Sequence, residues 1–436
     1  GKAAMQFSKT ENKAIKETVL YGTHESGLRV YIIPKKGFSK YYAIYGTEYG
    51  SIDEMIKPTP DSEPTRLPDG IAHYLEHKLF EESDGKNAFD KFALTGASSN
   101  AFTSFDMTAY LFSCTDRFYE NLEILLEFVN NPYFTEENVA KEQGIIGQEI
   151  KMYDDDPGWQ LFFNSLGAMY HKNPVKTDIA GTVESISHIT PELLYKCHET
   201  YYNPSNMRLV LVGDIDPKKV VPYIDKYVDK SRDRGEVERI RPQEPKGVVT
   251  HRVSRRLSVS KPMFLIGFKE KTEGESGERL LRKQIVTKIL TEILFGRSGD
   301  FFTELYGKGL IDATFDKDAE LEKGYGFTSI SGETKDPDEV YRLTLEYIER
   351  VKKDGLRAED IARAKRIAIG KSLREYDSVE QTGNSFIRGF MNGFNLLDYR
   401  GIAESITADE LTARLFEHFD GEYSVLSVIE PESAEK

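Results

Sequence analysis

The sequence predicts an α+β protein made of two duplicated domains of similar fold, each a mostly antiparallel sheet packed against helices. The chain has 436 residues, which exceeds the 100 to 200 residues or so of one ordinary domain. Strand-like and helix-like segments follow the same order in both halves, and a polar, irregular stretch rich in charge, Gly and Pro separates them. We therefore place domains at 1–228 and 253–436, with a linker at 229–252.

The first half opens with strand-like segments at 27–36 and 41–53, which carry β-branched and aromatic residues bounded by Gly. Two helical segments follow, at 119–132 and at 135–156, and Thr135 is a suitable N-cap for the second. The continuous apolar run NMRLVLVGDIDP then indicates a buried strand at the end of this half.

The second half repeats this order. Strand-like segments at 262–270 and 324–333 precede a helical one at 338–355, and the chain ends in EYSVLSVIEP, which matches the buried strand of the first half in kind. FTEENVAKE at 134–142 aligns without a gap with LRAEDIARA at 356–364, and we infer an internal duplication.

The duplication is informative where the two copies differ. On this alignment Glu142 falls opposite Ala364 and Glu149 opposite Lys371, and nothing in the second half resembles His-x-x-Glu-His. The pattern of strands and helices is therefore present in both halves, but the His-x-x-Glu-His motif and the two glutamates are present only in the first.

Composition limits the class of protein. Hydrophobic residues make up 39% and charged residues 30%, with 25 Phe and 24 Tyr, which is typical of a folded globular chain. The formal net charge of −14 argues against nucleic acid or an anionic membrane as the main partner. No apolar run suits membrane insertion, the N-terminus lacks a signal-peptide core, and the 2 cysteines do not form a disulfide framework, so we expect a cytoplasmic protein.

The strongest chemical signal is GIAHYLEHKLF at 70–80, which has the propensities of a helix. His73 and His77 are four residues apart and therefore share a face, so both imidazoles can reach one point, as a tetrahedral zinc site requires. Glu76 borders the same face and can reach a water on the metal.

A catalytic zinc site needs a third protein ligand and one open position. The second helix of the first half carries an apolar stripe of Val139, Ile146 and Ile150, and Glu142 and Glu149 lie on or beside that stripe. A carboxylate there is costly unless it is paired or metal-bound. We predict Glu149 as the third ligand of one zinc ion per chain, and Glu142 as an acceptor that orients a ligating histidine.

With these residues in place, the chain resembles the inverzincins, and in particular the pitrilysin and mitochondrial-processing-peptidase family of zinc metallopeptidases in its half-length bacterial type. PDGIAHYLEHKLF, GASSNAFTSFDMTAYLF, EQGIIGQEI and AGTVESI stand in the family's order, with 71 residues between His77 and Glu149. The resemblance covers nearly the whole chain. It implies His73, His77 and Glu149 as zinc ligands, Glu76 as general base and Glu142 as a supporting acidic residue.

The resemblance also implies how a peptide substrate binds. SSNAFTSF is similar to the family's substrate-binding edge strand, against which an extended peptide pairs through its backbone, and Asn100, Ala101 and Phe102 match that strand best. An ordinary core-facing strand is the alternative.

One departure from the family bears on partners. Active members use an Arg and a Tyr seven residues later, from a second-half domain, to bind the substrate carbonyl. Here the corresponding stretch is FFTELYGKGLIDATF, where Tyr306 replaces the Arg and Asp312 or Ala313 replaces the Tyr. Either the chain pairs with a similar-length sister subunit that carries the Arg/Tyr pair, which we favour, or it has lost efficient proteolysis.

The sequence thus supports a zinc endopeptidase that hydrolyses peptides or small unfolded proteins. A structural subunit of a peptidase-like heterodimer is the main alternative, and a metal-dependent hydrolase of small molecules is a third. An intact Glu76 favours the enzyme, because a structural zinc site needs no base.

Overall fold

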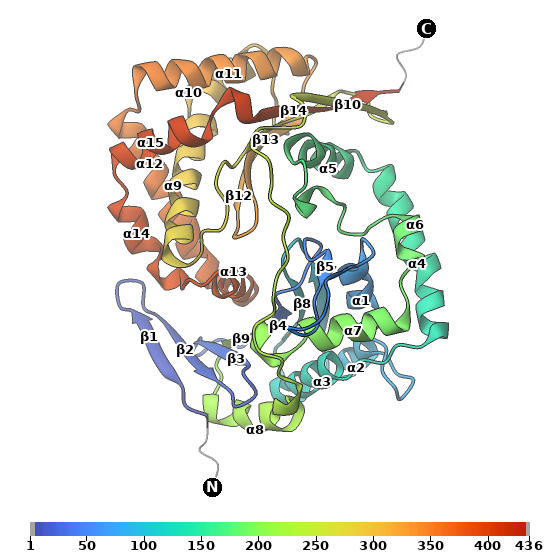
Figure 1. The fold of residues 1–436 in the computed structure, drawn as a ribbon. Helices are drawn as coiled ribbons and strands as arrows, with labels where there is room; N and C mark the ends of the chain where they lie inside the picture. The colour runs from blue at the N-terminus through green and yellow to red at the C-terminus, as the bar shows by residue number, and fades with distance from the viewer. Residues whose placement is uncertain (1–4, 433–436) are drawn as a thin grey trace.

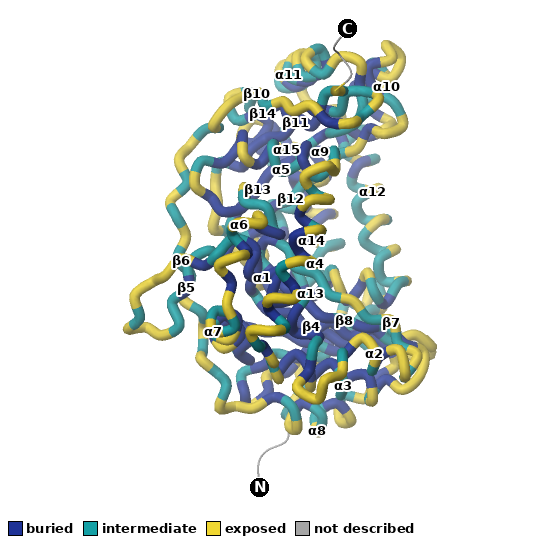
Figure 2. The backbone as a smooth tube through the Cα atoms, turned by 90° about the vertical axis from the view of Figure 1, so that its right-hand side faces the viewer, coloured by how far each residue is buried: buried dark blue, intermediate teal, exposed yellow. Residues whose placement is uncertain are grey.

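The predicted α+β class is confirmed in a computed structural model that describes residues 5–432. Two sheets, one from each half of the chain, lie one above the other with helices around them (Figure 1). Each half has its own cluster of buried hydrophobic residues. The segment between the halves runs along the outside of the molecule (Figure 2).

The larger sheet has seven strands in the order β1-β2-β3-β9-β4-β8-β7. Only the β3–β9 pair is parallel. Its strands are β1 (Ser8–Asn12), β2 (Glu17–Thr23), β3 (Arg29–Pro34), β4 (Tyr41–Thr47), β7 (Ser98–Thr103), β8 (Thr108–Cys114) and β9 (Met207–Gly213). A separate short hairpin pairs β5 (Met55–Ile56) with β6 (Thr65–Arg66).

The smaller sheet has five strands in the order β10-β14-β11-β13-β12, and only β10–β14 is parallel. Its strands are β10 (Arg252–Leu257), β11 (Met263–Lys269), β12 (Asp316–Leu321), β13 (Gly326–Glu333) and β14 (Ser424–Pro431). This order repeats β3-β9-β4-β8-β7 strand for strand, including the position of the parallel pair. The topology therefore agrees with an internal duplication.

The helices also follow one another in matching order. The first half contains α1 (Ile71–Leu79), α2 (Ala88–Leu94), α3 (Phe118–Asn130), α4 (Glu136–Asp154), α5 (Pro157–Met169), α6 (Val183–Ile186), α7 (Pro191–Tyr201) and α8 (Pro217–Tyr227). The second half contains α9 (Gly277–Phe295), α10 (Asp300–Gly307), α11 (Pro337–Asp354), α12 (Ala358–Arg374), α13 (Val379–Met391), α14 (Tyr399–Ser405) and α15 (Ala408–His418). Within residues 5–432, none of these helices is long and apolar enough to cross a membrane.

The two halves exchange one helix each. Helix α5 of the first half packs on β10, β11 and β14 of the second, while α13 of the second half packs on β4 and β9 of the first (Figure 1). All seven residues of β9 are buried as a result, because helices of its own half cover one face and α13 covers the other. This explains why β9 is a continuous apolar run instead of an alternating one.

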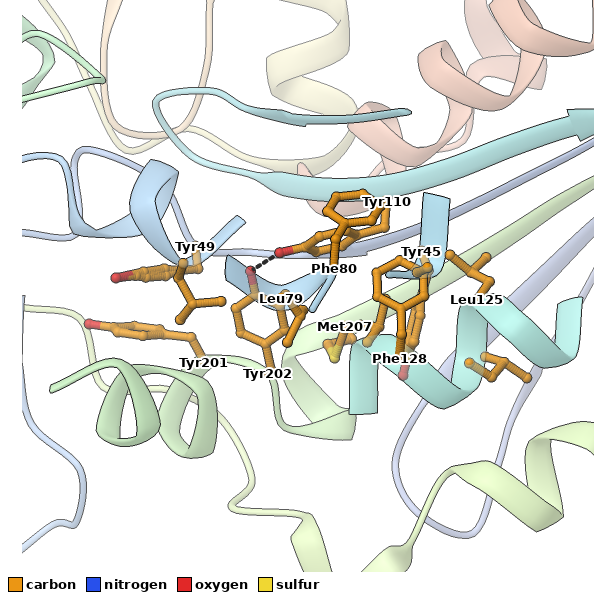
Figure 3. Packing of buried hydrophobic residues seen from close by; sticks show 14 of the residues in the cluster. Tyr45, Tyr49, Leu79, Phe80, Tyr110, Leu125, Phe128, Tyr201, Tyr202 and Met207 are labelled. Carbon is orange, nitrogen blue, oxygen red and sulfur yellow. Dashed lines mark hydrogen bonds between the residues drawn. The ribbon is translucent and has the colours of Figure 1, made fainter. Parts of the chain in front are cut away.

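Aromatic residues fill the core of the first half. Figure 3 shows rings from the sheet and from α7 packed against the end of α1 and against α3. The two buried hydroxyls of Tyr110 and Tyr202 satisfy each other in a hydrogen bond of 2.8 Å. Since a buried polar group without a partner costs free energy, this pairing lets large amphipathic rings serve as core residues.

The segment predicted as a linker is bound to the body of the protein. Arg239 and Arg241 both contact the buried carboxylate of Asp53, at 2.9 and 2.8 Å. Glu244 accepts backbone N–H groups of residues 171–173 and pairs with Lys269 of the second sheet at 2.7 Å. Charged residues of the predicted linker therefore form ion pairs with both halves.

Candidate metal centre

The position of α1 is set by two glycines. Gly70 precedes the helix with φ 92°, and a Cβ atom there would lie 2.4 Å from the carbonyl oxygen of Ala180. Gly181 has φ 75°, and its Cβ would lie 2.3 Å from the carbonyl oxygen of Asp69. Because only glycine fits both positions, the chain around 180 lies directly against the N-terminus of α1. The Ser185 hydroxyl adds a hydrogen bond of 2.8 Å to the Asp69 carbonyl.

Three donor atoms converge next to this helix. The Nε2 atoms of His73 and His77 are 3.1 Å apart. Glu149 on α4 places one carboxylate oxygen 3.5 Å from His73 Nε2 and the other 3.5 Å from His77 Nε2. These three residues form a group whose ligand atoms all lie within 4.8 Å of one another.

The spacing of these atoms fits a zinc ion. Donors about 2.0–2.1 Å from one ion in tetrahedral geometry are separated by about 3.3 Å. The two histidine Nε2 atoms are 3.1 Å apart, and each of them lies 3.5 Å from a different oxygen of Glu149. Two imidazole nitrogens and a carboxylate oxygen are also a donor set that zinc accepts. The residues present therefore fit the metal, with three protein ligands and room for a fourth.

Glu149 comes from a helix with a well-defined start. Thr135 and Asn138 form a capping box at the N-terminus of α4, in which each side chain accepts the other residue's backbone N–H. The bond with His73 lowers the pKa of Glu149 to about 2 although its partial burial opposes this, and a 2.6 Å hydrogen bond from Tyr153 adds to the effect. Glu149 is thus a charged carboxylate, as a metal ligand must be.

Glu76 lies beside the donors but outside their group. One of its oxygens is 4.0 Å from His77 Nε2, and the other accepts a 3.4 Å hydrogen bond from the Thr103 hydroxyl on β7. Burial raises the pKa of Glu76 to about 7, although the charge of His73 opposes the shift. A carboxylate with a raised pKa near neutral is suited to exchange protons with a bound water.

The predicted supporting residue, Glu142, is buried behind His77. One oxygen of Glu142 lies 3.8 Å from His77 Nδ1, which is longer than a hydrogen bond. Its other oxygen accepts a 3.2 Å hydrogen bond from Lys78, a fully buried lysine that also pairs with Glu81 at 2.7 Å. The role of Glu142 as the acceptor of His77 therefore needs a small movement of the side chain.

A cavity of about 470 Å³ opens in front of the donors, and β7 forms one of its walls. Strand β7 is the edge of its sheet, as the resemblance implied, and Asn100, Ala101 and Phe102 all line the cavity. The Ala101 N–H donates to the Asn100 side chain at 2.8 Å, so this group points away from β8 to the free edge. An extended peptide can pair with that edge once Asn100 turns away.

The residues at the Arg/Tyr positions lie elsewhere. Tyr306 is exposed near the end of α10, and Asp312 pairs with Lys261 at 3.2 Å. Helix α10 is at the far end of the second half from α1 (Figure 1), and neither these residues nor Ala313 line the cavity. Within residues 5–432, no arginine lines the cavity beside His73, His77 and Glu149.

Three polar or aromatic residues near the donors were not predicted from sequence. They are Lys78, Tyr153 and Trp159. Tyr153 follows Glu149 by four residues, and this helical spacing could have indicated a contact. The burial of Lys78 had no such signal, because lysine is normally exposed.

A second group of potential metal donors consists of the buried His24 and the exposed Glu25 and Asp225. His24 Nε2 is 2.6 Å from the Asp225 carboxylate, and Nδ1 is 2.8 Å from the Ser26 hydroxyl. Both ring nitrogens therefore have hydrogen-bonding partners within the protein, and we regard this histidine as structural.

The fold and the donor group together are typical of a metallopeptidase. The chain belongs to peptidase family M16: family models described as "Insulinase (Peptidase family M16)" and "Peptidase M16 inactive domain" match residues 62–183 and 188–368. A protein named uncharacterized zinc protease YmfH, from Bacillus subtilis, is 42% identical over 97% of this chain and 99% of its own. The predicted family is therefore confirmed.

Solved structures agree. An M16-like peptidase structure from Alicyclobacillus acidocaldarius covers 99% of both chains with a TM-score of 0.89 and 33% identity. The structure of pitrilysin has a TM-score of 0.76 and 16% identity, which shows the fold alone, and the match covers 99% of this chain but 47% of pitrilysin. This chain thus corresponds in fold to about half of that larger protein.

Proposed function

We propose that the protein is a zinc-dependent endopeptidase that hydrolyses peptides or small unfolded proteins. His73, His77 and Glu149 hold the metal and Glu76 is the general base. The observation that carries this proposal is the convergence of two imidazole nitrogens 3.1 Å apart with a carboxylate that places one oxygen 3.5 Å from each of them, beside a buried carboxylate and an open strand edge. Relatives named zinc proteases support the class of activity.

The residues divide the reaction among them. A zinc ion bound to the three ligands would supply Lewis-acid chemistry, which acidifies a water and polarises a carbonyl group. Glu76 takes a proton from the attacking water and returns it to the leaving amine. Strand β7 aligns the peptide backbone, and the same alignment admits many sequences because backbone groups are common to all peptides.

Replacing Glu76 with Gln tests the proposal. The variant keeps size and hydrogen bonding but cannot accept the proton, so zinc content should stay near one per chain while peptide cleavage falls by about 10²- to 10⁴-fold. Metal analysis and cleavage of a quenched fluorescent peptide measure the two quantities. Glu320→Gln is a matched control, because Glu320 is also a carboxylate whose pKa burial raises to about 7, but it lies outside the metal centre. Unchanged turnover in Glu76→Gln would refute the mechanism.

We further propose that a sister subunit of similar length completes the site with an Arg/Tyr pair. The likeness to one half of pitrilysin and the remote position of Tyr306 support this idea. The purified chain should cleave peptides poorly until such a subunit is added. Full activity of the chain alone would contradict it.

The alternative is a catalytically weak or inactive subunit of a peptidase-like heterodimer. Replacement of the Arg/Tyr positions by Tyr306 and by Asp312 or Ala313 favours it. The two proposals separate in the reconstituted pair: Glu76→Gln abolishes cleavage only if this chain supplies the working site.

A further inference from the structure

We propose that the second half of the chain positions the third metal ligand, Glu149, through Tyr153, Gln160 and Arg255. This inference rests on the proposed metal site and adds to it one residue that contacts the ligand Glu149, which is Tyr153, and two that act through Tyr153, which are Gln160 and Arg255. It assigns a task in the metal centre to a half of the molecule that carries no ligand.

The first link is Tyr153, one helical turn after Glu149 on α4. Its hydroxyl donates a 2.6 Å hydrogen bond to Glu149 Oε1, the same oxygen that lies 3.5 Å from His73 Nε2. The bond leaves Oε2 facing His77. Tyr153 thus determines which carboxylate oxygen each histidine meets, as acceptors and donors around metal ligands commonly do.

The Tyr153 ring is itself fixed. It stacks on the indole of Trp159, with ring centroids 3.9 Å apart and an interplanar angle of 6°. The indole N–H donates to Asp178 at 2.6 Å, and Asp178 accepts the backbone N–H of Ala180 at 2.9 Å. The stack is therefore tied to the segment that lies against the start of α1.

The next link crosses to the second half. Trp159 and Gln160 lie in the first turn of α5, the helix that packs on β10, β11 and β14. Gln160 is 8% exposed; it donates to the Tyr153 carbonyl at 2.9 Å and accepts from Arg255 of β10 at 2.5 Å. Arg255 is thus joined to Glu149 through two residues.

The second copy of the scaffold lacks the residues that α4 and α5 contribute to this arrangement. The residue offset of 222 that relates the starts of α4 and α12 also relates the starts of α5 and α13. At this offset Tyr153 corresponds to Glu375, Trp159 to Gln381 and Gln160 to Thr382. The aromatic support is present only where a ligand is present to be supported, which a purely structural wall would not require.

Zinc affinity measures the proposal independently of catalysis. The metal-free full-length chain is titrated with zinc against a chromophoric chelator. Tyr153→Phe keeps the stacked ring and removes only the hydroxyl, so zinc affinity should fall by about 10- to 100-fold. Arg255→Ala should lower it by about 3- to 10-fold, as expected for the partial loss of one supporting hydrogen bond. Arg256→Ala, the next residue of the same exposed strand, is the matched control and should leave affinity unchanged.

A cobalt(II) spectrum and the melting temperature of the metal-free protein distinguish positioning from packing. The spectrum should change in Tyr153→Phe, while the melting temperature should not. Unchanged zinc affinity in Tyr153→Phe would overturn the proposal, and a loss in that variant with wild-type affinity in Arg255→Ala would overturn the part assigned to the second half. If the wild-type chain binds no zinc, the proposed function itself fails, and the two failures are thereby distinguishable.

Discussion

The two halves of the molecule place different side chains on one scaffold. In the first, α1, α4 and β7 surround a cavity that contains His73, His77 and Glu149. In the second, α9, α12 and β12 surround a cavity of about 520 Å³ in which Lys371 occupies the position of Glu149. A metal centre therefore depends on a few side chains placed on an arrangement that the fold supplies in any case.

The halves also differ in how they accommodate buried carboxylates. Glu142 of the first half meets Lys78 and His77, whereas its counterpart Ala364 is an apolar residue with no exposure. Where the halves meet, Asp106 of the first half and Glu320 and Glu322 of the second lie around Arg388, and burial raises the pKa values of these three carboxyl groups. A carboxylate is retained in the interior only with a partner or a proton.

The largest effect is expected when Glu149 is replaced by lysine, the residue at the equivalent position of the second half. Glu149→Lys copies the second half into the first and places an ammonium group among the donors. We expect complete loss of zinc and a fall in peptide cleavage of more than about 10³-fold, since the metal's Lewis-acid chemistry is lost. Metal analysis and a cleavage assay check both. Lys371→Glu is the matched control and should gain no metal, because none of the described residues that line that cavity is a histidine. Stoichiometric zinc in Glu149→Lys would show the ligand assignment wrong.

The edge strands β7 and β12 allow a second comparison of the halves, with a smaller expected effect. Ala101 of β7 and Ala319 of β12 occupy equivalent positions, and each backbone N–H is bonded by the side chain of the residue before it, Asn100 or Asp318. Proline removes that N–H but is tolerated at a free edge. Ala101→Pro should lower kcat/KM for peptides by about 10- to 100-fold, mainly through KM, because one backbone pairing with the substrate is lost.

Zinc content measured beside the kinetics separates this effect from damage to the site. Ala319→Pro disturbs the other edge equally and should leave kcat/KM near the wild-type value. Equal losses in the two variants would mean that β7 has no special part in substrate binding.

Much of this comparison could be predicted from the sequence because its signals are local. The gapless alignment of 134–142 with 356–364 locates the starts of α4 and α12 at Glu136 and Ala358. The histidine spacing predicts a shared helical face, and the apolar stripe around Glu149 predicts a carboxylate turned inward. Each inference depends only on residues within one or two turns of the same helix.

Features that depend on distant packing could not be predicted in this way. The pattern of α5 shows which of its faces is apolar but not that this face covers the sheet of the other half. The burial of Lys78 depends on Asn138 and Glu142, which are 60 or more residues away. The charge, Gly and Pro content that indicated a linker could not show its ion pairs, because its partners Asp53 and Lys269 belong to the two domains that it connects.

The acidic cluster between the halves, formed by Asp106, Glu320 and Glu322, gives a prediction about stability, with the smallest expected effect. Burial raises the pKa of Glu322 to about 8, the nearby Asp106 carboxylate contributes, and the charge of Arg388 opposes the shift. Asn392 and Glu320 are the other groups that face it. In the unfolded chain a glutamate has a pKa of about 4.3.

The folded state holds the proton of the Glu322 carboxyl group more tightly than the unfolded chain does. The stabilising effect of this proton is complete below about pH 4.3 and is lost as the pH rises through about 8. The wild type should therefore lose on the order of 1 to 3 kcal/mol of unfolding free energy between pH 6 and pH 9. Glu322→Gln carries a permanent neutral group and should reduce that loss, as urea unfolding at the two pH values would show. Glu422→Gln changes an exposed glutamate and should keep the wild-type dependence. If Glu322→Gln also keeps the wild-type pH dependence, the proton resides on another group. Asp106, which comes from the turn between β7 and β8, is then the residue to replace next.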